Sequence, residues 1–174
     1  MGRQALIVVD MLVDFVDEGG KLYCGPSSRA IIPAVGCRLA DARERGVPVI
    51  YVCDSHRPDD PEFRMFPTHC VAGTPGAEVV AELAPREGEV IVRKRRFSAF
   101  YGTDLDLTLR ELGAKELLLV GVCTNICVLY TAADARMRDY DVTVPAGCVA
   151  TFDEEAHRLA LREMEKTLGV RVVA

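Results

Sequence analysis

Short, uniformly apolar runs alternate with amphipathic helical segments along this chain, and this alternation limits the fold more than any other sequence feature. Runs without polar interruptions are typical of strands buried on both faces of a parallel sheet. We expect strands at 5–9, 47–53, 89–93, 117–122, 141–145 and 170–173. Apolar residues at helical spacing predict helices at 31–45, 76–83, 105–112, from 124 onward, and 153–168. The predicted fold class is therefore α/β, with three α/β/α layers around a doubly wound, mostly parallel six-stranded sheet.

Length and composition are those of an ordinary globular protein. With 174 residues, 49% of them apolar and 27% charged, the chain can bury one sizeable core, so we expect a single domain over 1–174. The net charge of −5, with both signs mixed along the chain, argues against nucleic acid or an anionic membrane as a partner. No apolar run approaches the roughly 20 residues of a membrane span.

Cysteine usage and the first residues indicate a compartment. The chain has seven cysteines, an odd number without zinc-finger spacing, which predicts reduced thiols rather than a disulfide framework. The apolar N-terminal stretch is interrupted by Asp10 and Asp14 and lacks a small-residue cleavage site, so it is not typical of a signal peptide. We therefore expect a cytoplasmic protein.

Chemically reactive side chains follow four of the predicted strands. Each lies at or just past the carboxyl end of a strand: Asp10, Asp54, His56, Lys94 and Cys127. Open α/β sheets bind their ligands at this edge. We therefore expect these five residues to meet there.

The stretch LLLVGVCTNICVLY, residues 117–130, places Cys127 in the first turn of a helix that follows a strand. Thr124 and Asn125, both good N-cap residues, predict where that helix begins. Unpaired backbone N–H groups and the helix dipole favour a thiolate at such a position. Cys127 is therefore the candidate nucleophile. The alternative is a core residue, since buried cysteines are common and this chain has seven.

A thiol that attacks a carbonyl group needs a neighbour that takes its proton and later returns it to the leaving amine. Asp10 is the carboxylate in position for this role, and Lys94 could hold Asp10 in place and lower the pKa of the thiol. Backbone N–H groups near Cys123 and Cys127 predict an oxyanion hole. Taken singly, Asp10 also fits a solvated strand end and Lys94 a solvated basic run, so only their convergence supports the catalytic roles.

A second cluster predicts a divalent metal ion. Residues two apart in an extended segment point the same way, so Asp54 and His56 can share one cation. His69, in the long loop at 57–75, supplies a third ligand, and Glu62 a nearby carboxylate. This set suits zinc first, with iron and manganese as alternatives, and leaves positions open for water or substrate. Solvated loop histidines are the alternative, but two of the chain's three histidines fall here.

Five segments in register make the chain resemble the isochorismatase-like cysteine hydrolase superfamily, most closely its compact nicotinamidase branch. They are ALIVVDMLVDFVDEGG, VCDSHRPDDPEF, FPTHCVAGTPGAE, KRRFSAFYGTDLD and LVGVCTNICV, and they span residues 5–130. The resemblance implies the three-layer fold and a triad of Asp10, Lys94 and Cys127 that acts through a thioester acyl-enzyme. A non-proline cis peptide is implied between Val122 and Cys123, beside the oxyanion hole.

The same resemblance assigns further residues and an assembly. Four positions match metal ligands of the family, the last of them found only in some members: Asp54, His56, His69 and Glu62. Three positions match the lining of the substrate pocket: Phe15, Phe66 and Tyr101. Members of the family are commonly homodimers or homotetramers, so we expect a homo-oligomer.

The resemblance also implies a reaction, in which a small primary amide, with nicotinamide as the leading candidate, is hydrolysed to a carboxylate and ammonia. Phe66 stands where nicotinamidases usually carry tryptophan, and Ser55-His56-Arg57 replaces the common Trp-His-Pro, so carbamoyl, ureido and maleamate-type amides stay open as substrates. A noncatalytic flavodoxin-like module, or a thiol redox protein using Cys123 and Cys127, is the alternative from another class. The C-x-x-x-C spacing and the lack of a glycine-rich phosphate loop after the first strand argue against both.

Overall fold

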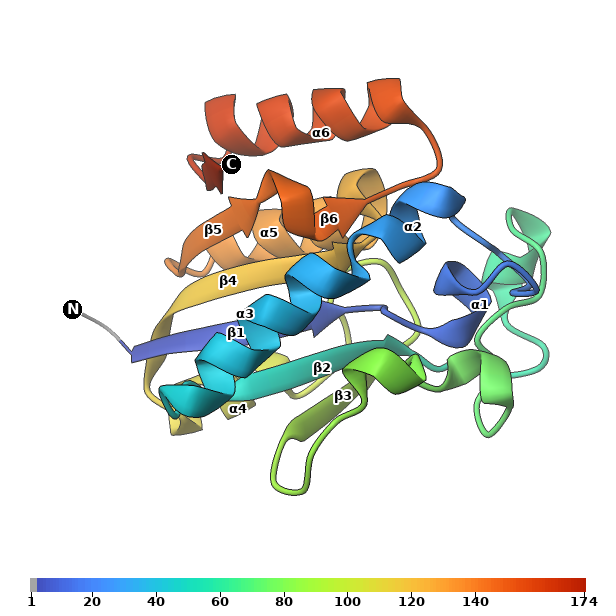
Figure 1. The fold of residues 1–174 in the computed structure, drawn as a ribbon, viewed down its shortest axis with the longest axis horizontal. Helices are drawn as coiled ribbons and strands as arrows, with labels where there is room; N and C mark the ends of the chain where they lie inside the picture. The colour runs from blue at the N-terminus through green and yellow to red at the C-terminus, as the bar shows by residue number, and fades with distance from the viewer. Residues whose placement is uncertain (1–2) are drawn as a thin grey trace.

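Seven parallel strands form the central layer of the computed structural model, which describes residues 3–174 (Figure 1). The strand order is β3-β2-β1-β4-β5-β7, and the short β6 pairs with the carboxyl end of β4. The strands are β1 Arg3–Val9, β2 Val49–Asp54, β3 Val90–Lys94, β4 Ala114–Val122, β5 Asp141–Pro145, β6 Val149–Ala150 and β7 Arg171–Val173. The predicted α/β class with a parallel sheet is confirmed. Only β6 was not predicted, because two residues are too few to form an apolar run.

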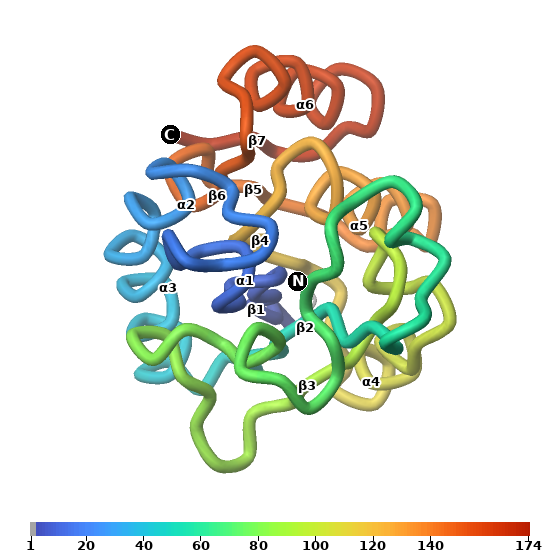
Figure 2. The backbone as a smooth tube through the Cα atoms, turned by 90° about the vertical axis from the view of Figure 1, so that its right-hand side faces the viewer, coloured from blue at the N-terminus to red at the C-terminus, as the bar shows by residue number. Residues whose placement is uncertain are grey.

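Helices cover both faces of this sheet. They are α1 Val13–Val16, α2 Pro26–Ala30, α3 Ile32–Glu44, α4 Leu105–Glu111, α5 Leu129–Arg136 and α6 Glu154–Lys166. Alternate residues of β1 point to opposite faces, so Leu6 packs with α1 and α3, whereas Ile7 packs with α4, α5 and α6. Figure 2 shows α3 on one side of the sheet and α4 and α5 on the other. No helix within residues 3–174 is both long and apolar enough to cross a membrane.

The predicted helix at 76–83 is wrong. The segment forms two short 3₁₀ turns, Pro75–Ala77 and Ala81–Leu83, separated by extended backbone. Between them Val79 forms an antiparallel bridge with Leu12, just after β1. Because this bridge uses backbone groups that a helix would need, the segment runs as a partner of the chain that leaves β1.

Four short helical elements were not predicted: α1, α2 and the 3₁₀ turns Pro61–Arg64 and Ala146–Cys148. Each contains only three to five residues. That is about one turn, so no apolar periodicity can develop. Two of them, α1 and α2, lie in the connections near the carboxyl edge of the sheet (Figure 1).

Candidate active site

The carboxyl edge of the sheet brings together the reactive residues that were predicted to meet there. Asp10 directly follows β1, Asp54 and Lys94 are the last residues of β2 and β3, and Cys127 lies in the π-helical turn Thr124–Val128 after β4. The strand order reverses between β1 and β4, so this is the switch point at which α/β sheets bind ligands. The predicted convergence is confirmed.

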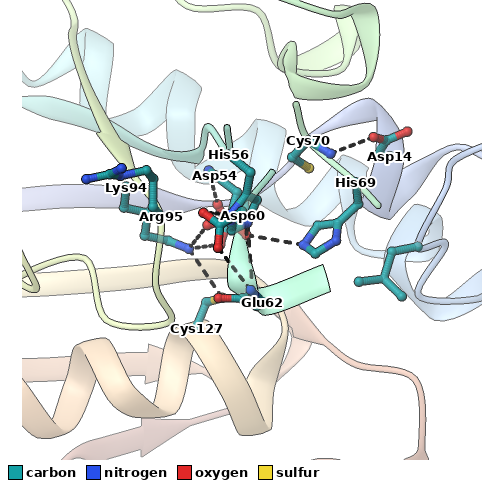
Figure 3. Close-up of polar contacts among 12 residues, drawn as sticks. Asp14, Asp54, His56, Asp60, Glu62, His69, Cys70, Lys94, Arg95 and Cys127 are labelled. Carbon is teal, nitrogen blue, oxygen red and sulfur yellow. Dashed lines mark hydrogen bonds and ion pairs between the residues drawn. The ribbon is translucent and has the colours of Figure 1, made fainter. Parts of the chain in front are cut away.

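Lys94 contacts three of these groups. Its Nζ lies 2.5 Å from Oδ1 of Asp54 and 3.4 Å from Sγ of Cys127 (Figure 3). The same atom lies 2.8 Å from Oδ2 of Asp10. Burial alone would lower the pKa of Lys94, but the two carboxylates outweigh burial and raise this pKa well above its usual value. Lys94 is therefore a buried ammonium group, unlike its exposed neighbour Arg93.

Asp10 is held in place by the neighbouring strand. Its backbone has a φ of 49°, and its Oδ1 accepts a 2.8 Å hydrogen bond from the backbone N–H of Asp54. Burial, followed by the Asp54 carboxylate, raises the pKa of Asp10 to about 6, and Lys94 acts in the opposite direction. A carboxylate oxygen of Asp10 lies within 4.8 Å of the Cys127 sulfur. A carboxylate with this pKa is ionised at neutral pH and still accepts a proton readily.

The Cys127 side chain is buried beneath α5, and its sulfur faces Lys94. Burial raises the pKa of Cys127 well above its usual value, with the carboxylates of Asp10 and Asp54 adding to the effect of burial and Lys94 opposing it. The prediction that the helix N-terminus favours a thiolate is therefore wrong for the resting protein. The thiol needs a base, which the nearby Asp10 carboxylate can provide.

The turn that carries Cys127 begins differently from the prediction. Cys123 is its N-cap residue and makes no side-chain cap. Oγ1 of Thr124 lies 2.9 Å from Nδ1 of His157 on α6, and Oγ1 of Thr151 donates a 2.6 Å hydrogen bond to Oδ1 of Asn125. Thr124 and Asn125 therefore anchor the turn to the C-terminal part of the chain, and their predicted capping role is wrong.

Two backbone features shape the end of β4. Gly121 has a φ of +115°, and a Cβ at this position would lie only 2.0 Å from the carbonyl oxygen of Val9 on β1. Only glycine fits there. The peptide bond between Val122 and Cys123 is cis, as the family resemblance implied. Cys123 then lines the pocket beside Cys127.

Asp54, His56 and His69 form a buried group whose ligand atoms lie within 4.8 Å of one another. Nδ1 of His56 pairs with Oδ2 of Asp60 at 3.1 Å, and Nδ1 of His69 with the carbonyl oxygen of Pro67 at 2.7 Å. Both Nε2 atoms thus stay available, and that of His56 is buried without a hydrogen-bond partner in the described part of the chain. Metal-bound histidines are normally held through the other ring nitrogen in this way, so these residues fit a divalent cation.

Glu62 and Asp60 lie beside this group. Oε1 of Glu62 is 3.9 Å from Nε2 of His56, so Glu62 is at the margin of the site and its ligand role stays a prediction. Asp60 was not predicted, yet its carboxylate binds His56, accepts the backbone N–H of Glu62 at 3.0 Å and pairs with Arg96 at 3.0 Å. The available signal was an acidic residue four positions after His56 and directly before Pro61.

An apolar pocket opens beside the Cys127 sulfur and the candidate metal site. Four phenylalanines from separate segments line it: Phe15, Phe66, Phe97 and Phe152. Phe15 and Phe66 lie where they were predicted. Tyr101 does not line the pocket, because it is 68% exposed and lies in another surface groove beside Arg93. Phe97, whose ring centroid is 6.2 Å from that of Phe66, takes the place on the wall that was predicted for Tyr101.

Another buried carboxylate, that of Asp14, links the segment after β1 to the loop that carries His69. It accepts hydrogen bonds from the backbone N–H groups of Cys70 at 2.7 Å and Lys21 at 3.0 Å (Figure 3 shows the first). Gly76 packs directly against it, since a Cβ there would lie 2.2 Å from Oδ2. Asp14 precedes Phe15 in the chain and Cys70 follows a candidate metal ligand, so one side chain fixes the spacing between ring and ligand.

The chain is similar to known proteins in both sequence and overall structure. The family model described as Isochorismatase domain matches residues 4–173. The structure is similar to nicotinamidase PncA from Bacillus subtilis, with a TM-score of 0.94 and 38% identity over 99% of each chain. It is similar to N-carbamoylsarcosine amidase from Thermoplasma acidophilum, with a TM-score of 0.89 and 36% identity over 98% of this chain and 95% of that one. A third relative, the pyrazinamidase of Pyrococcus horikoshii in complex with zinc, has a TM-score of 0.92 and 36% identity over 98% of both chains.

Proposed function

The chain belongs to the isochorismatase-like hydrolase family, and from that premise we propose that it hydrolyses a small primary amide, nicotinamide first, through a cysteine thioester. One observation supports this above all others. The ammonium group of Lys94 contacts both the Asp10 carboxylate and the Cys127 sulfur, beside an apolar pocket. A sulfur, a base and a fixed positive charge are the parts that covalent cysteine catalysis needs.

In the first half of the reaction, Sγ of Cys127 attacks the amide carbonyl carbon while Oδ2 of Asp10 takes the thiol proton. Oδ2 is paired with Lys94 at 2.8 Å, and a carboxylate oxygen has a second lone pair that can accept this proton. Lys94 stabilises the negative charge on the sulfur as it forms. The backbone N–H groups of Cys123 and Cys127 then stabilise the oxyanion of the tetrahedral intermediate.

In the second half, Asp10 returns the proton to the amide nitrogen, the C–N bond breaks and ammonia leaves. The acyl group is now a thioester on Cys127. The Asp10 carboxylate, ionised again, takes a proton from a water molecule whose oxygen attacks the thioester carbon. When the carboxylic acid leaves, the Cys127 sulfur regains its proton from Asp10 and the site is restored.

The metal site fits zinc first, held by Asp54, His56 and His69 with Glu62 as a further ligand. When bound, such a cation supplies a Lewis acid for a nitrogen or oxygen donor of the substrate. The chain's own residues prepare this site, because the Asp60 carboxylate and the Pro67 carbonyl hold the two imidazoles by their Nδ1 atoms. The zinc complex of the Pyrococcus horikoshii relative supports this choice of metal.

The pocket favours a flat, uncharged amide. Its wall carries four phenylalanines, and among the lining residues that the structure describes there is no arginine or lysine. The carboxylate of a maleamate-type or ureidoacrylate-type substrate would therefore be desolvated without a cationic side chain. The two carboxylates in the lining, Asp54 and Glu62, offset the charge of a bound metal ion, so the metal site gives the pocket little net attraction for a substrate anion. These features support nicotinamide over the acidic alternatives.

Ammonia release by the full chain tests the proposal, with nicotinamide, maleamate and an N-carbamoyl amino acid as competing substrates. We expect nicotinamide to have the highest kcat/KM, and Cys127→Ala to lower its kcat by ~10⁴-fold or more. Cys37→Ala, which removes an exposed thiol, is the matched control and should keep the wild-type rate. Activity retained in Cys127→Ala would contradict the mechanism, and a preference for maleamate would contradict the substrate.

A further inference from the structure

Two thiols that take no part in the proposed proton transfers lie in contact with each other near Cys127. Sγ of Cys24 and Sγ of Cys123 are 3.2 Å apart, although 99 positions separate the two residues in the chain. Both side chains are buried, at 1% and 4% exposure, and both thiols are free. The mechanism uses only the backbone N–H of Cys123, so neither sulfur has a role in amide hydrolysis.

The backbone on each side of this pair is fixed by hydrogen bonds. The N–H of Cys24 donates to the carbonyl oxygen of Phe15 over 2.8 Å. The carbonyl oxygen of Cys123 accepts from the N–H groups of Ile126 and Val128, both at 3.1 Å. A disulfide needs an S–S distance of about 2.05 Å, so the sulfurs must approach by about 1 Å.

Two cavities border the pair. Cys123 lines the substrate pocket, Cys24 lines a groove of about 380 Å³, and Phe152 lines both. Ser27, Thr151 and His157 are among the residues that line this groove. A water molecule takes up about 30 Å³ in the liquid, so a reagent as small as hydrogen peroxide fits in the groove that Cys24 lines.

We propose that Cys24 and Cys123 form an oxidation site, at which a hydroperoxide converts the two thiols into a disulfide. The sulfur of Cys24 attacks one peroxide oxygen, the O–O bond breaks, and Cys24 becomes a sulfenic acid while one water (or alcohol) leaves. The sulfur of Cys123 then attacks the sulfur of Cys24, the S–O bond breaks, and a second water leaves. Two electrons pass from the sulfurs to the peroxide, both thiol protons end in water, and a dithiol reductant reverses the change.

The order of these steps follows from the surroundings of each sulfur. The Cys24 hydrogen bond, followed by burial, raises the pKa of Cys123 well above its usual value, so Cys123 stays a thiol. Cys24 borders the groove and meets the oxidant first. Cys123 is already in contact with it and serves as the resolving thiol.

Disulfide formation would act on the proposed reaction, and this consequence rests on the proposed function. Because hydrogen bonds hold the backbone on both sides, closing the gap between the sulfurs would strain the turn at Cys123, whose N–H belongs to the proposed oxyanion hole. A misplacement of about 1 Å at a catalytic group can lower a rate by about 100-fold. We therefore expect oxidation to lower amide hydrolysis by about 10- to 100-fold.

Mass spectrometry tests the site independently of activity. Full-length Cys127→Ala protein, which lacks the nucleophile, is treated with hydrogen peroxide, alkylated and digested without reduction. We expect two peptides joined by a disulfide between Cys24 and Cys123. The same pair should form in the double variant with Cys148→Ala and should be absent from the double variant with Cys24→Ala. Cys148 is the matched control, because it is a buried thiol of the same core cluster. Oxidation of Cys37 or Cys148 without the Cys24–Cys123 pair would overturn the proposal.

Activity measurements on proteins that keep Cys127 test the consequence. We expect peroxide to lower the activity of the wild type and Cys148→Ala, dithiothreitol to restore it, and Cys24→Ala to keep most of its activity. If Cys24→Ala does not fold, Cys24→Ser gives the same comparison. An equal loss of activity in Cys24→Ala after peroxide treatment would overturn control of the reaction by this pair. A Cys24–Cys123 disulfide that forms without loss of activity would overturn it as well. No amide hydrolysis by the untreated protein would contradict the proposed function, while the mass spectrum would still decide the oxidation site.

Discussion

The backbone N–H of Asp54 donates a 2.8 Å hydrogen bond to Oδ1 of Asp10. The same Asp54 side chain lies 2.5 Å from Nζ of Lys94 through Oδ1 and 3.5 Å from Nε2 of His56 through Oδ2. Asp54 therefore contacts two members of the proposed triad and also belongs to the candidate metal site. A change in either site should alter the other.

Lys94→Met should lower both stability and activity. The substitution leaves the carboxylates of Asp10 and Asp54 buried without their cation, and breaking a buried ion pair costs about 3–5 kcal/mol. Arg93→Met, one position earlier on β3 but exposed, should change the free energy of unfolding by less than about 0.5 kcal/mol. Urea denaturation of both variants measures the difference. Equal stabilities would show that Lys94 does not neutralise these carboxylates.

His69→Ala should weaken zinc binding by at least about 10-fold, because it removes one ligand of the buried group. His157→Ala is the control, since the chain's third histidine lies outside that group. Zinc content by elemental analysis and zinc-dependent unfolding report the affinity without an activity assay. At a zinc concentration about 100 times Kd, the wild type should gain about 2.7 kcal/mol. A wild-type protein without bound metal, and without a rise in Tm on adding zinc, would refute the site.

Gly121→Ala should destabilise the fold severely. The new methyl group would lie 2.0 Å from the Val9 carbonyl oxygen, in a backbone conformation with a φ of +115°. Because backbone cannot move aside as a side chain can, we expect a loss of more than about 4 kcal/mol. Gly147→Ala meets no atom within 4 Å and should be near neutral. Similar denaturation midpoints for the two variants would contradict the close approach of β1 and β4.

Glu89→Gln should lower stability in a pH-dependent way. Burial alone would raise the pKa of Glu89, but Arg43, which binds both carboxylate oxygens at 2.8 and 2.9 Å, holds it below its usual 4.5. The ionised pair therefore contributes stability above this pH and loses it as the pH falls through the lowered pKa. We expect a difference of about 1–2 kcal/mol at neutral pH that disappears on acidification. A difference independent of pH would exclude the ion pair as its source.

All strands except β6 could be predicted because each contains an apolar run, and their parallel order then placed Asp10, Lys94 and Cys127 at one edge. Other features depend on contacts that no local pattern contains. The pKa of Cys127 is set by burial and by carboxylates from two other strands, so a prediction from the helix terminus alone had the wrong direction. The helix at 76–83 failed because the pairing of Val79 with the chain after β1 was invisible in the segment itself.

The aromatic residues show a similar limit. Phe97 and Tyr101 stand in the same short stretch, FSAFY, and both suit a pocket wall. Which of them turns inward depends on the path of the chain after β3, and the structure selects Phe97. The role of Asp60 beside the metal site was not predicted for a related reason, because its partner Arg96 lies 36 positions away in the chain.

The Asp14 carboxylate has a consequence for engineering this molecule. A transplanted version of the loop at 57–75, taken from a protein with a different ligand set, would have to present a backbone N–H where Cys70 now donates to Asp14. It would also have to join the chain so that Gly76 keeps its place against Asp14, because any side chain at position 76 would displace the carboxylate. A graft that exchanges the metal ligands must therefore also keep the contacts of Asp14 with the backbone N–H at position 70 and with Gly76.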